Sequence, residues 1–288
     1  MILIIFTFHS IIKTSNDVGV KKMTDWLGIK NKVAIVTGGS SGIGASIVEE
    51  LLAEGVKVAN FDLSEGTLTH DNLLFASVDV SSRESVEAGL AKVLETFGTV
   101  DALVNNAGIN IPRLLVDSKD AKSEFELSDA IFDKMIAVNQ KGVYLMSQAV
   151  GRVLAEKQSG VIINMSSESG LEGSEGQSCY AATKAAVNSF TRSWAKELGK
   201  QGVRVVGIAP GIMEETGLRT IQYETALAYT RNITVEELRA GYSKTSTIPL
   251  GRSGKLSEVA DLVCYFMSDR ASYITGVTTN VAGGKTRG

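Results

Sequence analysis

The sequence predicts an α/β fold, a doubly wound parallel sheet of about seven strands in a single domain. Two observations predict it. Short runs rich in β-branched residues alternate with helical periodicity along residues 24–288, and a glycine-rich turn follows the first of these runs. Alternation of this kind is typical of parallel strands joined by right-handed helical crossovers, with helices on both faces of the sheet. Residues 24–288 contain no internal repeat or low-complexity linker, which favours one domain.

The strands are expected where β-branched runs are bounded by turn residues. In chain order they cover residues 33–37, 57–61, 73–77, 102–104, 161–165, 203–208 and 277–280. Helical patterns fill most gaps, over residues 42–54, 82–97, 129–157, 178–200 and 257–268.

One region, residues 211–250, interrupts this rhythm with a helical insert around residues 220–242. Ligands bind at the carboxyl ends of strands in such sheets, and the insert follows a strand end. It is therefore a candidate substrate lid, although an ordinary pair of connecting helices fits the sequence equally well.

Composition narrows the classes of function. The net charge is -3 and the sequence pI is near 5.6, so there is no basic surface of the kind that binds nucleic acid. Two cysteines are too few for a disulfide framework and favour a reducing compartment, so we expect a cytoplasmic protein. Cys179 is interpreted as a small buried side chain, because no histidine accompanies it. No metal site is expected.

Residues 1–23 differ from the rest of the chain. The apolar run from Met1 to Ile12 is too short to cross a bilayer, which takes about 20 residues. It also lacks the flanking charges and cleavage site of a signal peptide. We therefore interpret residues 1–23 as an N-terminal extension, either disordered or mis-called upstream of a start near Met23, and expect no membrane association.

The turn after the first strand carries glycines in the spacing Gly-x-x-x-Gly-x-Gly, at Gly38, Gly42 and Gly44. Glycines at these places let the backbone approach a pyrophosphate, whose charge then meets the N-terminus of the next helix. Asp62 closes the second strand, where a carboxylate binds the ribose hydroxyls of an adenosine. A 2′-phosphate there would meet a like charge. The sequence therefore predicts a Rossmann-type site for NAD rather than NADP.

Tyr180 and Lys184 are four residues apart in a helical stretch, which places both side chains on one helix face. A phenol has a reference pKa of about 10, and a cation one turn away lowers it toward the range of acid–base catalysis. Most pairs with this spacing simply lie on a helix surface. A nucleotide site in the same chain favours redox chemistry.

With these motifs in order, the chain resembles the short-chain dehydrogenase/reductase family from about Lys32 to the C-terminus. The resemblance implies that Tyr180 is the general acid/base and that Lys184 binds the nicotinamide ribose and lowers the tyrosine pKa. Ser167 would orient the substrate oxygen, and Asn139 would hold a water in a proton relay. Ser167 is preferred to Ser166, because the family places its serine thirteen positions before the tyrosine and Ser166 would face the other way.

The resemblance also implies a homotetramer and a set of cofactor contacts. The carboxyl ends of the third and fourth strands add Asp79 and the segment around Asn106 to the glycine turn. The full predicted NAD set comprises Gly38, Ser40, Ser41, Gly42, Ile43, Gly44, Asp62, Asp79, Val80, Asn106, Ala107, Gly108, Tyr180, Lys184, Pro210 and Gly211.

Residues 168–180, 210–220 and 278–288 resemble the polyol-phosphate dehydrogenases of this family, which interconvert D-sorbitol 6-phosphate and D-fructose 6-phosphate with NAD. A sugar phosphate needs cations for its dianion and polar groups for its hydroxyls. Arg219 and Arg113 are the favoured phosphate ligands, and Lys285 and Arg287 are candidates to reach a neighbouring subunit's site. The predicted substrate contacts are Arg113, Ser167, Glu168, Glu172, Gln177, Tyr180 and Arg219.

Two alternatives remain open at this point. A short-chain reductase acting on another polyol or on a 3-oxoacyl thioester would share every family motif. A protein that senses NAD(H) without turnover would share the fold, because fold does not fix function.

Overall fold

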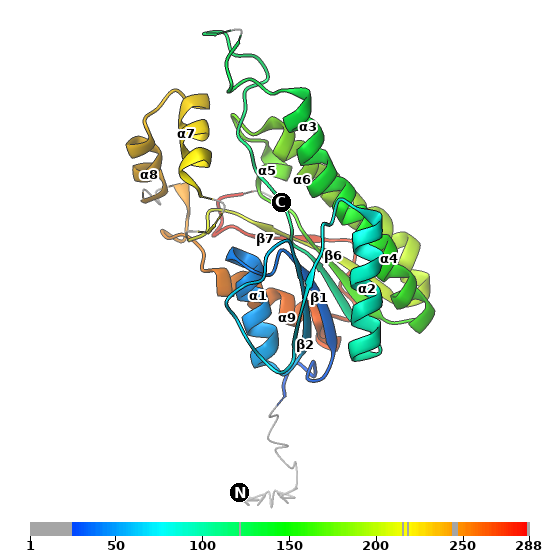
Figure 1. Cartoon of the computed structure of the whole chain (residues 1–288). Helices are drawn as coiled ribbons and strands as arrows, with labels where there is room; N and C mark the ends of the chain where they lie inside the picture. The colour runs from blue at the N-terminus through cyan, green and yellow to red at the C-terminus, as the bar shows by residue number, and fades with distance from the viewer. Residues whose placement is uncertain (1–24, 121, 215, 218, 244–246, 287–288) are drawn as a thin grey trace, which may run out of the picture.

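A computed structural model of the chain describes residues 25–120, 122–214, 216–217, 219–243 and 247–286, so the predicted extension 1–23 lies outside the described residues. The described strands form one parallel sheet in the order β3-β2-β1-β4-β5-β6-β7 (Figure 1). From β1 the chain adds β2 and β3 on one side of the sheet and then β4 to β7 on the other. This order confirms the predicted doubly wound α/β fold. The strands are β1 Val33–Thr37, β2 Lys57–Asp62, β3 Leu73–Ser77, β4 Ala102–Asn105, β5 Gly160–Met165, β6 Val203–Pro210 and β7 Thr278–Val281.

Helices cover both faces of the sheet, because successive residues of the central strands point to opposite faces and are apolar on both. In β1, Ala34 and Val36 pack against α1 (Gly42–Ala53) and α9 (Leu256–Met267) in one core cluster. Val33 and Ile35 point the other way, into a second cluster. That face is covered by α2 (Arg83–Phe97), α4 (Gly142–Lys157) and α6 (Ser178–Leu198).

The predicted helix over residues 129–157 is divided in three. It consists of α3 (Asp129–Ile136), a π-helical turn over Ala137–Lys141, and α4. Asn139 lies in the middle of the π turn and is completely buried. Turns of this kind are rare, and they occur often at functional sites because they redirect a side chain.

The insert forms two helices, α7 (Ile221–Thr230) and α8 (Val235–Ser243), as the sequence predicts. A small core of Leu227, Ala228 and Leu238 joins them. Figure 1 shows this pair beyond the carboxyl end of the sheet, apart from the two main helical layers. A short helix that the sequence analysis missed, α5 (Ser169–Glu172), follows β5.

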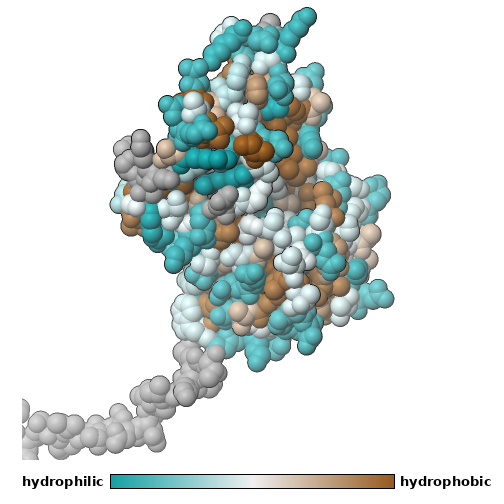
Figure 2. Space-filling model, turned by 60° about the vertical axis from the view of Figure 1, so that its left-hand side comes forward, coloured by the Kyte–Doolittle hydropathy of each residue, from teal (hydrophilic) through white to brown (hydrophobic). Residues whose placement is uncertain are grey.

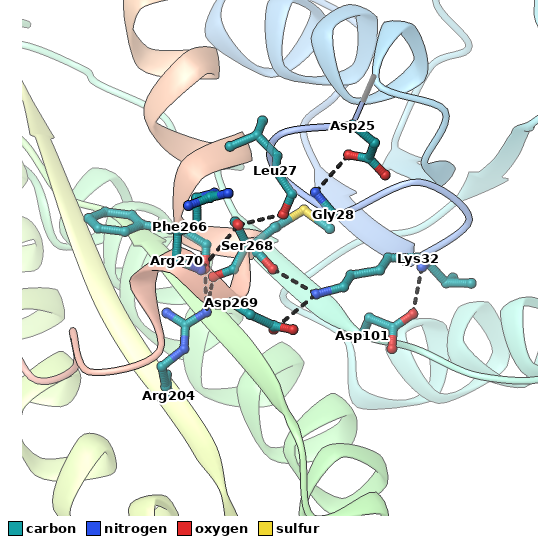
Figure 3. Close-up of polar contacts among 12 residues, drawn as sticks. Asp25, Leu27, Gly28, Lys32, Asp101, Arg204, Phe266, Ser268, Asp269 and Arg270 are labelled. Atoms are coloured by element: carbon teal, nitrogen blue, oxygen red, sulfur yellow. Dashed lines mark hydrogen bonds and ion pairs between the residues drawn. The ribbon is translucent and has the colours of Figure 1, made fainter. Parts of the chain in front are cut away.

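The segment before β1 is fastened at the opposite, amino-terminal edge of the sheet (Figure 3). Ser268 donates a hydrogen bond to the carbonyl of Leu27, and the ammonium of Lys32 lies 3.3 Å from the carboxylate of Asp269. Asp101 accepts a hydrogen bond of 2.7 Å from the backbone N–H of Val33. These contacts are structural, because ligands of doubly wound sheets bind at the other edge.

The surface mixes hydrophilic and hydrophobic residues. Figure 2 shows the two kinds interspersed over one face of the molecule. Among the helices that the structure describes, none combines the length and apolar character needed to cross a bilayer.

Candidate active site

Two adjoining cavities open at the carboxyl ends of the strands, where the strand order reverses. The first has a volume of about 450 Å³ and is lined by the glycine turn and the ends of β2 and β4. The second has a volume of about 370 Å³ and is lined by the loop after β5, the start of α6 and the insert. Both are bounded by Tyr180, Ser166 and Pro210. Tyr180 therefore lies where the contents of the two cavities would meet.

The glycine turn has the shape of a phosphate cradle. Gly38 has a φ of +65°, which favours glycine, and a Cβ added to Gly44 would lie 1.9 Å from the carbonyl oxygen of Gly38. Ser41, the N-cap of α1, makes no side-chain hydrogen bond to the helix within the described chain. The helix N-terminus thus keeps its positive dipole directed at the first cavity. These residues fit the pyrophosphate of a dinucleotide.

Most of the predicted NAD contacts line the first cavity, with two exceptions. Ser40 faces away, since its hydroxyl donates to the carbonyl of Ser64 at 2.6 Å, and Gly211 lines the second cavity instead. The contacts that do line the first cavity are Gly38, Ser41, Gly42, Ile43, Gly44, Asp62, Asp79, Val80, Asn106, Ala107, Gly108, Tyr180, Lys184 and Pro210.

Lys184 and Asn139 meet beside Gly108, from which a Cβ would lie 3.6 Å and 3.4 Å, respectively, from the lysine Nζ and the asparagine Oδ1. Lys184 is buried, and its Nζ donates to the carbonyl of Met165 at 2.8 Å. The Asn139 amide accepts from the N–H of Ile109 and donates to its carbonyl, both at 2.8 Å. The family's lysine and asparagine positions are thus brought together.

The two serines at the end of β5 face different ways, as their alternation predicts. Ser166 is buried and donates to the carbonyl of Lys184 at 3.2 Å. Ser167 lines the substrate-side cavity beside Tyr180 and accepts from the N–H of Ser169 at 3.2 Å. Ser167 is therefore the serine that faces the second cavity without a bond to the Lys184 backbone in the described chain.

Burial dominates the acid–base properties of the pair. It raises the pKa of Tyr180, while a hydrogen bond with Ser167 lowers that pKa and the charge of Glu168 raises it. Burial also lowers the pKa of Lys184 to about 8. The Lys184 Nζ lies 5.7 Å from the centroid of the tyrosine ring. The direction for Tyr180 is opposite to the one predicted from the spacing, and desolvation of the phenolate is its largest cause.

Cys179 is buried, in agreement with the sequence interpretation. Burial raises the pKa of its thiol, which disfavours the nucleophilic thiolate.

Five substrate residues were predicted besides Ser167 and Tyr180, and the structure places four of them in the second cavity: Glu168, Glu172, Gln177 and Arg219. Arg113 is the exception. Its guanidinium donates to the carbonyl of Pro112 at 2.7 Å and lies 5.6 Å from the centroid of the Phe125 ring. Arg113 is not among the residues that line the cavity, so the structure does not bring it together with the other predicted substrate residues.

The cavity also contains residues that the sequence analysis did not select, namely Ser174, Tyr223, Arg231 and Tyr242. Three of them come from the insert, and the lid prediction was the signal that pointed to that region. Lys285 lines the same cavity and pairs with Glu168 of its own chain at 2.7 Å. The expectation that it reaches a neighbouring subunit is not supported, and Arg287 lies outside the described residues.

Comparison with known proteins agrees with this geometry. The family model described as short chain dehydrogenase matches residues 32–226. A sorbitol-6-phosphate 2-dehydrogenase of Klebsiella pneumoniae is 62% identical over 92% of this chain and 100% of its own length. A 3-oxoacyl-acyl-carrier-protein reductase of Escherichia coli (strain K12) is 36% identical over 90% of this chain and 98% of its own.

Solved structures give the same result. A 3-ketoacyl-(acyl-carrier-protein) reductase from Brucella melitensis, complexed with NADH, matches with a TM-score of 0.75 and 29% identity. The match covers 90% of this chain and 100% of that one. The glycine turn, the position of Tyr180 between the two cavities and these matches together show that the chain belongs to the short-chain dehydrogenase family.

Proposed function

We propose that this chain is an NAD-dependent oxidoreductase that interconverts D-sorbitol 6-phosphate and D-fructose 6-phosphate. The observation that carries the proposal is the position of Tyr180, at the junction of a cavity lined by the glycine turn and a cavity lined by polar side chains. The Klebsiella pneumoniae relative that is 62% identical is named for this reaction.

The polar lining of the second cavity favours a polyol phosphate as substrate over the two alternative functions. Glu168, Gln177, Arg219 and Arg231 line it, and they suit hydroxyls and a phosphate better than an acyl chain. A reductase of 3-oxoacyl thioesters is therefore disfavoured, although such enzymes are 36% identical to this chain. A sensor without turnover has no need of Tyr180 at this junction.

NAD is favoured over NADP by Asp62. Its carboxylate lines the first cavity and accepts from the N–H groups of Leu63, at 2.7 Å, and Ser40, at 3.1 Å. A carboxylate suits two ribose hydroxyls and repels a 2′-phosphate. The Brucella melitensis reductase, whose structure contains NADH, supports the choice.

The chain's own residues handle the proton. When bound, NAD+ supplies the hydride acceptor and a positive charge on its nicotinamide ring. Ser167 orients the C2 hydroxyl of the polyol, and Tyr180 accepts the proton of that hydroxyl. The buried Lys184 ammonium favours the phenolate, and Asn139 beside it continues the path for the proton toward water. Because burial raises the Tyr180 pKa, the tyrosine depends on positive charge nearby to act near neutral pH.

Replacement of Tyr180 by phenylalanine tests the assignment. Tyr180→Phe should lower kcat by roughly 10²- to 10⁴-fold, because the proton acceptor is lost, while the Kd for NADH stays within about twofold. The assay is NADH formation with sorbitol 6-phosphate, unphosphorylated polyols and, in reverse, an acyl substrate. Tyr273→Phe, at a fully exposed tyrosine, is the matched control and should leave kcat and the Kd for NADH unchanged.

Each alternative gives a different pattern in that assay. Retained activity in the Tyr180→Phe variant would overturn the catalytic assignment. Turnover of an acyl substrate alone would select the reductase, and NADH binding without any turnover would select the sensor.

Further proposals concern the whole protein. We infer a cytoplasmic homotetramer, supported by the family to which the chain belongs and by its two unpaired cysteines. The insert, whose helices α7 and α8 help to line the substrate cavity, is proposed to act as its lid. Residues 1–23 are proposed to be a dispensable extension of residues 24–288, which N-terminal sequencing of the native protein would test.

A further inference from the structure

The second cavity holds three cationic side chains among the described residues, and they differ in how far their charges are already used. Lys285 is paired with Glu168 at 2.7 Å. Arg219 donates to the carbonyl of Met213 at 2.8 Å and stacks over the Tyr242 ring, 4.0 Å from its centroid. Arg231 has one side-chain hydrogen bond within the described chain, a long one of 3.4 Å to the Ser174 hydroxyl. Its charge is the least engaged of the three.

We propose that Arg231 is the principal ligand of the substrate's phosphate, in a subsite where the Ser174 oxygen helps to position the guanidinium and Arg219 lies at the border. The proposal rests on the proposed function, since it names the end of the cavity that holds the phosphate of a polyol phosphate. It replaces Arg113, which packs on Phe125 outside the cavity.

Arg231 is held by a fixed backbone. It is the C-cap of α7, and its N–H lies 3.2 Å from the carbonyl oxygens of Leu227 and Ala228. The anchored backbone gives the Arg231 side chain a fixed starting point at the edge of the cavity. A guanidinium carries five N–H donors, so the single bond to Ser174 leaves most of them for phosphate oxygens.

The loop opposite Arg231 packs tightly on the same helix end. Gly176 has a φ of +73°, and a Cβ there would lie 2.1 Å from the hydroxyl of Thr230. Ser174, two residues earlier, donates to the side-chain oxygen of Gln177 at 2.7 Å. The Ser174 hydroxyl proton therefore points to Gln177, and its oxygen accepts the hydrogen bond from Arg231. Close packing of loop and helix therefore builds the subsite.

The subsite is joined to the catalytic helix. Gln177 is the N-cap of α6, which carries Tyr180, and its amide donates to the hydroxyl of Tyr223 on α7 at 3.0 Å. Gln177 makes no side-chain capping bond to α6 among the described residues. The positive end of that helix dipole therefore faces the same cavity and favours an anion.

Among the described residues, three acidic side chains line the cavity, Glu168, Glu172 and Glu214, and all three make contacts within the chain. Glu168 is neutralised by Lys285 and also accepts from the Thr286 hydroxyl at 2.9 Å. Glu214 accepts from the N–H of Leu256 at 2.8 Å. In sorbitol 6-phosphate the phosphate lies four carbons beyond the reacting C2. With C2 at Tyr180, the chain then extends toward the insert and Arg231, within a cavity of about 370 Å³.

Replacement of Arg231 by leucine separates phosphate binding from catalysis. Arg231→Leu should raise KM for sorbitol 6-phosphate roughly 10- to 100-fold, the loss expected for a charge-assisted hydrogen bond, with kcat within about threefold. The kcat/KM for unphosphorylated sorbitol should fall by no more than about threefold, because that substrate has no phosphate. Arg231→Lys should recover part of the affinity for sorbitol 6-phosphate, since lysine restores the positive charge but not the paired N–H donors of a guanidinium.

Two controls sharpen the result. Arg252→Leu removes the same charge from an arginine outside the cavity, one already paired with Glu258 at 2.5 Å, and should leave KM unchanged. Arg219→Leu should have a smaller effect than Arg231→Leu, because Arg219 is held by Met213 and Tyr242.

Binding of inorganic phosphate gives a measurement that does not depend on turnover. With saturating NADH in the first cavity, so that the glycine turn is occupied, phosphate should raise the Tm of the wild type and not that of Arg231→Leu.

The failures are distinguishable. If the wild type does not turn over sorbitol 6-phosphate, the proposed function falls. If the wild type turns it over but Arg231→Leu slows both polyols equally, or its NADH complex still gains Tm with phosphate, the Arg231 subsite is wrong and the function stands.

Discussion

At the scale of single residues, a contact between distant parts of the chain sets the charge beside Tyr180. Glu168 directly follows Ser167, and its carboxylate lies 2.7 Å from the Lys285 ammonium and 2.9 Å from the Thr286 hydroxyl. Its negative charge raises the pKa of Tyr180. Lys285 offsets a carboxylate that would otherwise oppose ionisation of the tyrosine, and it does so from the segment after β7.

Lys285→Met should move the pH dependence of polyol oxidation upward by about one pH unit, because Glu168 would then stand unneutralised next to the phenol. The sign follows from the charge. A higher Tyr180 pKa means less phenolate at a given pH, so kcat/KM falls at neutral pH and recovers in alkali. The measurement is kcat/KM for sorbitol 6-phosphate from neutral to alkaline pH.

Charge-matched variants separate this effect from simple damage. Lys285→Arg should keep the wild-type profile, and Glu168→Gln combined with Lys285→Met should return the profile toward it, because both charges are then absent. A Lys285→Met enzyme with a changed KM but an unmoved pH profile would show that the pair acts on substrate binding alone.

At the scale of elements, the π turn over Ala137–Lys141 fastens the loop after β4 to the catalytic helix. Asn139 bonds both backbone groups of Ile109 at 2.8 Å and the hydroxyl of Thr183 at 3.2 Å. Asn139→Ala leaves buried polar groups without partners, at a cost of roughly 1–3 kcal/mol of unfolding free energy. We expect a lower Tm and, because the proton path is broken, a kcat reduced at least about tenfold.

Asn164→Ala is the matched control for Asn139→Ala. Asn164 is equally buried on β5, and its amide bonds Asn105 at 2.9 Å and Thr191 at 3.0 Å. Thermal unfolding should report a similar loss of stability in both variants, whereas kcat should fall substantially only in Asn139→Ala. An equal fall in kcat would reduce Asn139 to a structural role.

The same elements show what the sequence could predict. Strand bounds were correct to within two residues, because alternation and β-branched runs are local signals. The π turn was missed, and the bonds of its Asn139 to Ile109, thirty positions earlier, are contacts that no local pattern reveals. Arg113 and Arg231 could not be ranked from sequence, because stacking on Phe125 removes one from the cavity and the fold of the insert brings in the other.

At the scale of the whole molecule, the outer face of α6 has the features of a subunit contact. Ala182, Ala185, Ser189 and Ser193 are exposed and recur at helical spacing, so small side chains form a stripe along this face, with the exposed Arg192 beside it. Small residues let a second helix approach closely. This face lies in the layer of α4 and α6, away from both cavities, so a partner could pack there without covering the site.

Ser189→Arg therefore tests the proposed tetramer. The wild type should sediment as four chains, and the arginine should reduce it to a smaller species, because a long charged side chain cannot be buried where a helix packs closely. Helix content should be unchanged, since Ser189 is exposed in the single chain.

Glu95→Arg, on the exposed side of α2, is the control. It makes a larger change of charge and should leave the assembly intact. A wild type that sediments as one chain would contradict the tetramer. A Ser189→Arg variant that stays tetrameric would place the contact on another face.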